Sequence, residues 1–287
     1  MTDYSDQYFT NPDGLRQYYR DYNIAPPGSP TVLCMPGLTR NSRDFEDLAR
    51  HLAPTCRVIC AEQRGRGNSQ WDINPARYSL DTYVADMMAL LAHLDMDKVI
   101  AIGTSLGGLI TMMMVAMHPG VISGAVINDI GPELDPKGIA RIKSYVGKGT
   151  PPTNWQEAYA AVKSANTGVY PDFTDKDWQW FTRKLYADKS GKPVLLYDPA
   201  ISKNFDADNE ESAPSPDLWP VFEACYTIPT VVLRGELSDI LSAETLAKMA
   251  RLHPDLVPLI IKSKGHVPLL NETECFQAID ALIEKCK

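Results

Sequence analysis

The sequence predicts an α/β fold with a mostly parallel central sheet, and three observations lead to this prediction. From residue 31 onward, short β-branched apolar runs alternate with segments of helical period, as in sheets built from strand–helix–strand units. Two strand candidates, residues 7–10 and 16–20, flank the turn sequence Asn11-Pro-Asp-Gly14 and indicate an opening antiparallel hairpin. A stretch rich in Trp, Tyr, Asp and Pro, residues 133–220, breaks the alternation and is typical of an insertion.

The alternating pattern places each element in turn. Six strands are expected at 31–35, 57–61, 98–102, 124–128, 229–233 and 257–261. Helices are expected at 44–52, 81–94, 106–118, 243–252 and 273–285. The insertion offers no clear apolar strand; it predicts helices at 137–146, 155–165 and 175–186 and a polar loop at 206–216. The expected division is a core domain, 1–132 and 221–287, interrupted by a helical insertion, 133–220.

Composition limits the functional classes. A formal charge of -8 over 287 residues is opposite in sign to the basic surface that nucleic-acid binding needs. The longest apolar-rich stretch, Leu106 to Met117, is shorter than the roughly 20 residues of a membrane span. The polar, acidic N-terminus lacks a signal-peptide pattern, and six cysteines without a CxxC pair, several of them in apolar runs, predict buried free thiols. We therefore expect a cytoplasmic protein with a small-molecule substrate and neither nucleic-acid nor membrane partners; a homodimer stays open.

A candidate nucleophile stands at the end of the third predicted parallel strand. The strand leads into Gly103-Thr104-Ser105-Leu106-Gly107, a G-x-S-x-G sequence, and a helix follows at once. A sharp strand-to-helix turn lifts the serine hydroxyl above the sheet edge, and small residues two positions either side prevent clashes. The adjoining helix N-terminus favours a developing oxyanion. This context predicts that Ser105 is a nucleophile rather than a loop serine between glycines.

With this motif the chain resembles the α/β-hydrolase family, from residue 31 to the C-terminus outside the insertion. The segment Glu62-Gln-Arg64-Gly65-Arg66-Gly67-Asn-Ser69 looks like the family's Asp-x-Arg-Gly-x-Gly-x-Ser loop, with glutamate replacing the aspartate. The resemblance implies a mostly parallel central sheet with an N-terminal antiparallel hairpin, flanking helices and an inserted helical cap. It also implies an oxyanion hole from the backbone amides of Leu38 and Leu106, although Pro36 stands where relatives usually have histidine.

The other two members of a catalytic triad follow in the chain order serine, aspartate, histidine. His266 comes after the last apolar strand and before the final helix, where this fold presents its base. Asp239, after the strand at 229–233, is the expected acid. Glu236 in the same loop and Asp129, at the end of the strand before the insertion, are the alternatives.

The resemblance implies a two-step acyl transfer without metal or organic cofactor, most simply hydrolysis of an ester of a small to medium apolar acid, thioesters and lactones included. Cap aromatics could line the acyl pocket or only pack the cap helices; the substrate-binding candidates are Trp155, Tyr159, Trp178 and Phe181. Two other functions stay open: hydrolysis of a carbon–carbon bond in a ring-fission dienoate, which Val267 disfavours because many such enzymes have tryptophan after the histidine, and a slow-turnover receptor. Related dehalogenases and epoxide hydrolases use aspartate where Ser105 stands.

Overall fold

An eight-stranded sheet forms the centre of the molecule in the computed structural model, which describes residues 3–203 and 217–287. The strand order is β1–β2–β4–β3–β5–β6–β9–β10; β1 and β2 run antiparallel to their neighbours and the other strands are parallel. This confirms the predicted mostly parallel sheet with its opening hairpin. The strands are β1 (Ser5–Thr10), β2 (Arg16–Tyr22), β3 (Thr31–Met35), β4 (Arg57–Ala61), β5 (Val99–Thr104), β6 (Ile122–Asn128), β9 (Thr230–Gly235) and β10 (Leu256–Ile261).

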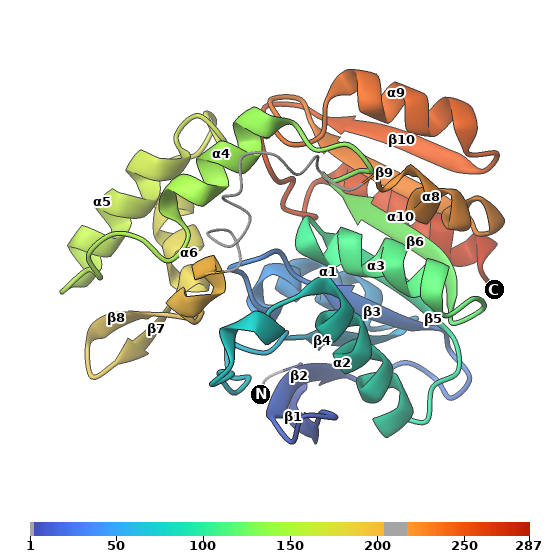
Figure 1. Cartoon of the computed structure of the whole chain (residues 1–287), viewed down its shortest axis with the longest axis horizontal. Helices are drawn as coiled ribbons and strands as arrows, with labels where there is room; N and C mark the ends of the chain where they lie inside the picture. The colour runs from blue at the N-terminus through green and yellow to red at the C-terminus, as the bar shows by residue number, and fades with distance from the viewer. Residues whose placement is uncertain (1–2, 204–216) are drawn as a thin grey trace.

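Helices cover both faces of this sheet (Figure 1). One core cluster joins it to α2 (Leu80–His93), α3 (Leu106–Met117), α8 (Trp219–Glu223) and α9 (Ala243–Leu252). The other joins it to α1 (Glu46–Leu52) and α10 (Thr273–Lys285). Side chains alternate between the clusters along each strand: in β3, Leu33 packs into the first, and Val32 and Cys34 into the second. The five predicted core helices are therefore confirmed, and α8 is an addition.

The insertion lies to one side of the central sheet (Figure 1). Its helices, α4 (Pro136–Tyr145), α5 (Trp155–Asn166) and α6 (Asp175–Leu185), confirm the three that were predicted. The insertion also contains a hairpin that the sequence did not predict, formed by β7 (Tyr186–Lys189) and β8 (Lys192–Leu195). Its turn residues, Ser190 and Gly191, have φ values of 53° and 79°, the left-handed pair that a two-residue hairpin requires. The polar loop predicted at 206–216 lies outside the described residues.

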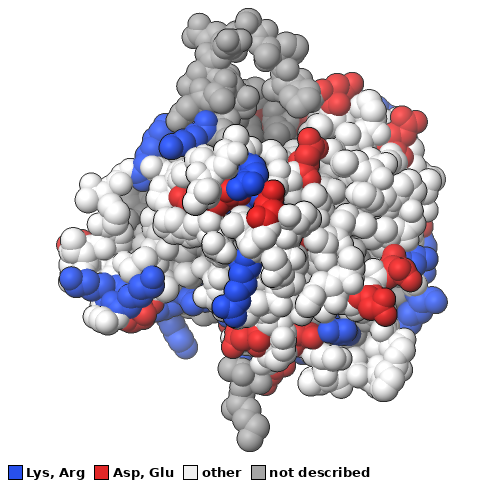
Figure 2. Space-filling model, turned by 60° about the horizontal axis from the view of Figure 1, so that its bottom comes forward, with Lys and Arg blue, Asp and Glu red and all other residues white. Residues whose placement is uncertain are grey.

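The cysteines and the surface can be compared with expectation. All six cysteines are free, and five are buried, as predicted. Among the described residues, no helix combines the length and apolar character needed to cross a bilayer. On the face shown in Figure 2, acidic and basic side chains are interspersed.

Candidate active site

Ser105 occupies a strained turn between β5 and α3. Its backbone angles, φ 51° and ψ -111°, are unusual for a residue with a side chain. The flanking glycines leave no room for a methyl group: a Cβ on Gly107 would lie 2.0 Å from the carbonyl oxygen of Met35, and one on Gly103 would lie 2.2 Å from that of Gly107. The close approach of these backbones is what the G-x-S-x-G spacing makes possible.

A chain of hydrogen bonds connects Ser105 with His266 and Asp129. The Ser105 Oγ lies 2.9 Å from His266 Nε2, and His266 Nδ1 lies 2.7 Å from Asp129 Oδ2. The Asp129 carboxylate is inaccessible to solvent, and His266 is nearly so. The structure thus brings together the serine and histidine that the sequence selected, and adds the carboxylate at the end of β6.

The expected contact between Asp239 and His266 was wrong. The Asp239 carboxylate instead forms a two-point ion pair with Arg141 of α4, with Nε–Oδ2 and Nη2–Oδ1 distances of 2.5 and 2.8 Å. Burial favours the neutral acid, but the hydrogen bonds and charge of Arg141, together with the charge of His266, outweigh it and hold the pKa of Asp239 below its usual value. The other alternative, Glu236, accepts a hydrogen bond from the Ser263 amide.

Asp129 is held in place by donors from the last residue of β9 and from the loop that follows it. Its Oδ1 accepts from the Gly235 amide at 2.8 Å, and its Oδ2 accepts from the Ser238 hydroxyl at 2.6 Å. The Ser238 Oγ in turn accepts from the amides of Ile240 and Leu241, both at 3.2 Å. Ser238, which sequence reasoning missed, thus stands beside Asp129, while its neighbour Asp239 turns to Arg141.

We expect Ser238→Ala to lower kcat by about ten- to a hundredfold with little change in KM, because a hydrogen bond to a charged group contributes roughly 1.5–3 kcal/mol. Ser238→Thr keeps the hydroxyl and should retain more of the rate. Steady-state kinetics on an ester that the wild type cleaves, with a thermal melt of each variant, would check this. An unchanged kcat in a folded Ser238→Ala protein would show that Asp129 does not depend on this donor.

The loop that carries His266 is bonded to the insertion. The Gly265 amide donates to the Val169 carbonyl at 2.7 Å, and the Tyr170 hydroxyl donates to the Val267 carbonyl at 2.9 Å. Residues 169 and 170 lie between α5 and α6, so the insertion contributes directly to the position of the histidine loop.

The segment after β3 lies against the nucleophile. A Cβ on Gly37 would lie 3.7 Å from the Ser105 Cβ, which places this backbone beside the serine. Leu106 is the first residue of α3, where an amide has no carbonyl partner within the helix. In the described part of the chain, the Leu38 amide likewise has no hydrogen-bond partner. Both amides are therefore free to bind an oxyanion.

A cavity of about 530 Å³ opens at Ser105 and His266. Core segments line one side. The insertion contributes the other through α4, α5, α6, β7 and β8 and the segments that connect them. Of the four aromatic candidates, Phe181 lines it and the other three do not. Trp178 is buried in the insertion's own core, and Trp155 and Tyr159 make hydrogen bonds with Asp188 and Asp175 near the surface. The aromatic lining comes mainly from residues not selected: Tyr145, Tyr170, Tyr186 and Tyr197.

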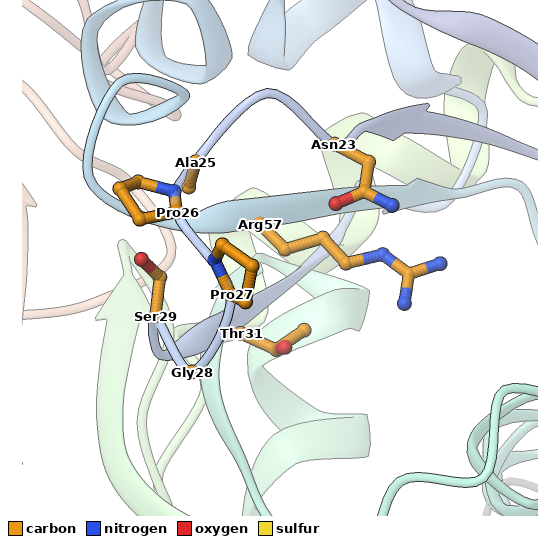
Figure 3. A pocket seen from close by; sticks show the side chains of 8 residues that line it. All are labelled: Asn23, Ala25, Pro26, Pro27, Gly28, Ser29, Thr31 and Arg57. Atoms are coloured by element: carbon orange, nitrogen blue, oxygen red, sulfur yellow. The ribbon is translucent and has the colours of Figure 1, made fainter.

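A second hollow, of about 350 Å³, lies at the amino ends of β3 and β4 (Figure 3). The residues that line it are Asn23, Ala25, Pro26, Pro27, Gly28, Ser29, Thr31 and Arg57. Arg57 is paired with Asp21 at 2.7 Å. Parallel sheets present their sites at the opposite, carboxyl ends of the strands, where Ser105 and Asp129 lie, and we therefore place the candidate site there. The described residues contain no cluster of three His, Cys, Asp or Glu side chains suited to a metal ion.

The fold and the nucleophile turn define an α/β hydrolase. Residues 30–273 match the family model described as alpha/beta hydrolase fold, and the chain belongs to this family. It is similar to a crystal structure of an α/β hydrolase from Novosphingobium aromaticivorans, with 44% identity, a TM-score of 0.93 and 99% of each chain covered.

Two relatives have named substrates. The 3-hydroxybutyrate-oligomer hydrolase of Cupriavidus necator is 33% identical over 90% of this chain and 89% of its own length. The 2-(acetamidomethylene)succinate hydrolase of Mesorhizobium japonicum is 28% identical over 85% of this chain and 84% of its own.

Proposed function

We propose that this protein is a serine hydrolase that cleaves carboxylic esters through an acyl-enzyme at Ser105. The observation that carries the proposal is the hydrogen-bonded series from Ser105 Oγ through both ring nitrogens of His266 to Asp129, set at a nucleophile turn. His266 is the general base, and Asp129 orients it and stabilises its charged form.

The reaction proceeds in two steps. His266 Nε2 takes the Ser105 proton as Oγ attacks the ester carbonyl, and the amides of Leu38 and Leu106 bind the oxyanion of the tetrahedral intermediate. The protonated histidine then gives its proton to the leaving alcohol as the intermediate collapses. Water, deprotonated by His266, attacks the acyl-enzyme in the second step and releases the acid.

Residues 133–220 act as a cap in this proposal. Their helices supply much of the cavity lining, and their bonds to the loop around His266 support a place directly over the nucleophile. A cap at this position shields the acyl-enzyme from bulk water and determines which acyl and alcohol groups fit.

Short oligoesters of a hydroxy acid are the substrate class we favour. The Cupriavidus relative is named for 3-hydroxybutyrate oligomers, whose units are joined by ester bonds. A cavity of about 530 Å³ suits a small oligomer. Hydrolysis of a carbon–carbon bond is the alternative kept from the sequence. The Mesorhizobium relative supports a substrate other than an ester in general, because the succinate in its name carries an acetamido group, which is an amide.

Ser105→Ala tests the proposal. The variant should lose activity on the linear dimer of 3-hydroxybutyrate by about 10⁴-fold or more, and a fluorophosphonate probe should label the wild type at this residue alone. Chromatography of released acid and mass spectrometry of the labelled peptide are the measurements. Labelling elsewhere would contradict the site. If the wild type cleaved esters no faster than the variant, hydrolysis of a dienoate would be the next function to test, followed by ligand binding as a slow-turnover receptor.

A further inference from the structure

Arg66, in the loop after β4, is a buried cation whose side chain reaches the segment beside the nucleophile. The residue is 0% exposed. Its Nε donates to the Leu38 carbonyl at 2.8 Å, and its Nη1 donates to the Arg64 carbonyl at 2.7 Å and to the Tyr83 hydroxyl at 2.8 Å. The guanidinium therefore connects the loop after β4 with the residue whose amide we expect to bind the oxyanion.

The neighbouring Arg64 shows how an arginine with a structural role is held in the same loop. It is also buried, and its guanidinium pairs with the Asp72 and Asp86 carboxylates at 2.7 and 2.6 Å. Arg66 has no carboxylate partner within the described residues, and among them its Nη2 has no hydrogen-bond partner. A buried charge without an opposite charge is costly to a fold. Stability alone is therefore a weak reason for this arginine, and its contact with Leu38 offers a functional one.

The backbone of Leu38 is held on both sides. The Gly37 carbonyl accepts from the Arg40 amide at 3.1 Å, and the Leu38 carbonyl accepts from Arg66. In a trans peptide the carbonyl and the following N–H point in opposite directions, so the bond at Gly37 sets the direction of the Leu38 amide. Because glycine lets the adjoining peptide group turn easily, the second bond is needed to limit its rotation.

The backbone around Arg66 is itself bonded to the insertion. The Gly67 amide donates to the Leu196 carbonyl at 2.7 Å, and the Asp198 amide donates to the Gly65 carbonyl at 2.8 Å. These two bonds flank Arg66, so its side chain extends from a fixed point. A side chain can position a neighbouring group only when it is locked in this way.

We propose that Arg66 is a positioning residue for the oxyanion hole: by holding the Leu38 carbonyl, it keeps the Leu38 amide directed at the place where the oxyanion forms beside Ser105. This inference rests on the proposed function and adds a residue outside the triad and the nucleophile turn. Removing an oxyanion-hole donor outright lowers kcat by about 10²–10³. Without Arg66 the amide remains and only its direction loosens, so we expect a smaller loss, about ten- to a hundredfold.

The test compares two inhibitors of the same shape: an alkyl trifluoromethyl ketone and the corresponding secondary alcohol. With the ketone, Ser105 Oγ adds to the carbonyl carbon, His266 takes the hydroxyl proton and the ketone oxygen becomes an oxyanion, as in the tetrahedral intermediate. The alcohol has no electrophilic carbon and forms no oxyanion. Arg66→Met should lower kcat on a cleaved ester and raise the inhibition constant of the ketone by the same factor, about ten- to a hundredfold, with little change for the alcohol.

Two further variants separate positioning from packing. Arg66→Lys keeps a charged donor and should retain part of the ketone affinity. Tyr83→Phe removes one acceptor of Nη1 but leaves the bond from Nε to the Leu38 carbonyl, so kcat and the ketone affinity should be nearly unchanged. A thermal melt of each variant shows that the protein is folded at the assay temperature.

Two results would overturn the inference. One is a folded Arg66→Met protein that binds the ketone as tightly as the wild type does; the other is equal weakening of ketone and alcohol, which would assign Arg66 to packing. If Arg66→Met did not fold, the ratio of the two inhibition constants in Arg66→Lys would decide in the same way. Failure of the proposed function looks different, because the wild type would then neither cleave esters nor form an adduct with the ketone.

Discussion

Asp129→Asn should lower kcat by about 10⁴-fold on any ester the wild type cleaves, while Asp239→Asn should lower it less than about tenfold. Asparagine preserves the shape of the buried side chain but can present its amide nitrogen to His266 Nδ1 and stabilise the wrong tautomer. Asp239 is bound to Arg141 at a partly exposed position, where an ion pair contributes little. Steady-state kinetics of both variants, with a melt of each, provide the measurement.

The two variants are matched in chemistry and differ only in position, so their comparison identifies the acid. If Asp239→Asn lost as much rate as Asp129→Asn while remaining folded, the loop after β9 would have to rearrange in solution to bring Asp239 to the histidine. A folded Asp129→Asn protein with nearly full activity would remove this carboxylate from the mechanism.

Gly107→Ala should destabilise the protein by about 3 kcal/mol or more, since the added methyl group would lie 2.0 Å from the Met35 carbonyl oxygen and neither backbone can yield cheaply. We expect the melting temperature to fall by roughly 5 °C or more. Loss of activity should accompany it, because β3 and the turn at Ser105 must separate. Differential scanning calorimetry checks the first effect and ester turnover the second.

Gly168→Ala is the control for this prediction. A Cβ there would meet no atom within 4 Å, and this glycine does not need a positive φ. Its melting temperature should stay within about 2 °C of the wild type. An equal fall in both variants would mean that the Gly107 effect reflects a general cost of replacing glycine rather than the contact between β3 and the nucleophile turn.

Most of the fold could be predicted because apolar periodicity records which faces are buried. β3 and β4 have the bounds that their apolar runs indicated, since each is buried on both faces between helices. The hairpin β7–β8 was missed because its strands have only four residues each and are largely exposed, so neither shows a long apolar run. Its signal was the pair Ser190-Gly191, a turn sequence between the short segments Tyr186–Lys189 and Lys192–Leu195.

The site was only partly predictable. Ser105 and His266 could be selected because a backbone motif and the chain order constrain them. The carboxylate that contacts His266 could not be selected from the sequence. Asp239 and its neighbour Ser238 occupy one loop, and the sequence does not show which of these side chains turns inward. The aromatic residues of the insertion posed the same problem: Phe181 and Trp178 share one helix, yet only Phe181 lines the cavity. Such choices depend on tertiary contacts such as the pair formed by Arg141.

The hydrogen bonds between the insertion and the loop that carries His266 link access to the cavity with the position of the histidine. Lifting residues 169 and 170 away from the core would break the hydrogen bonds to Gly265 and Val267, the two residues that flank His266. A conformation without these two hydrogen bonds would therefore have a less ordered histidine, and opening of the cavity would be coupled to the alignment of His266 with Ser105. A substrate that favours the closed cavity would, by the same linkage, favour the arrangement in which the base is aligned.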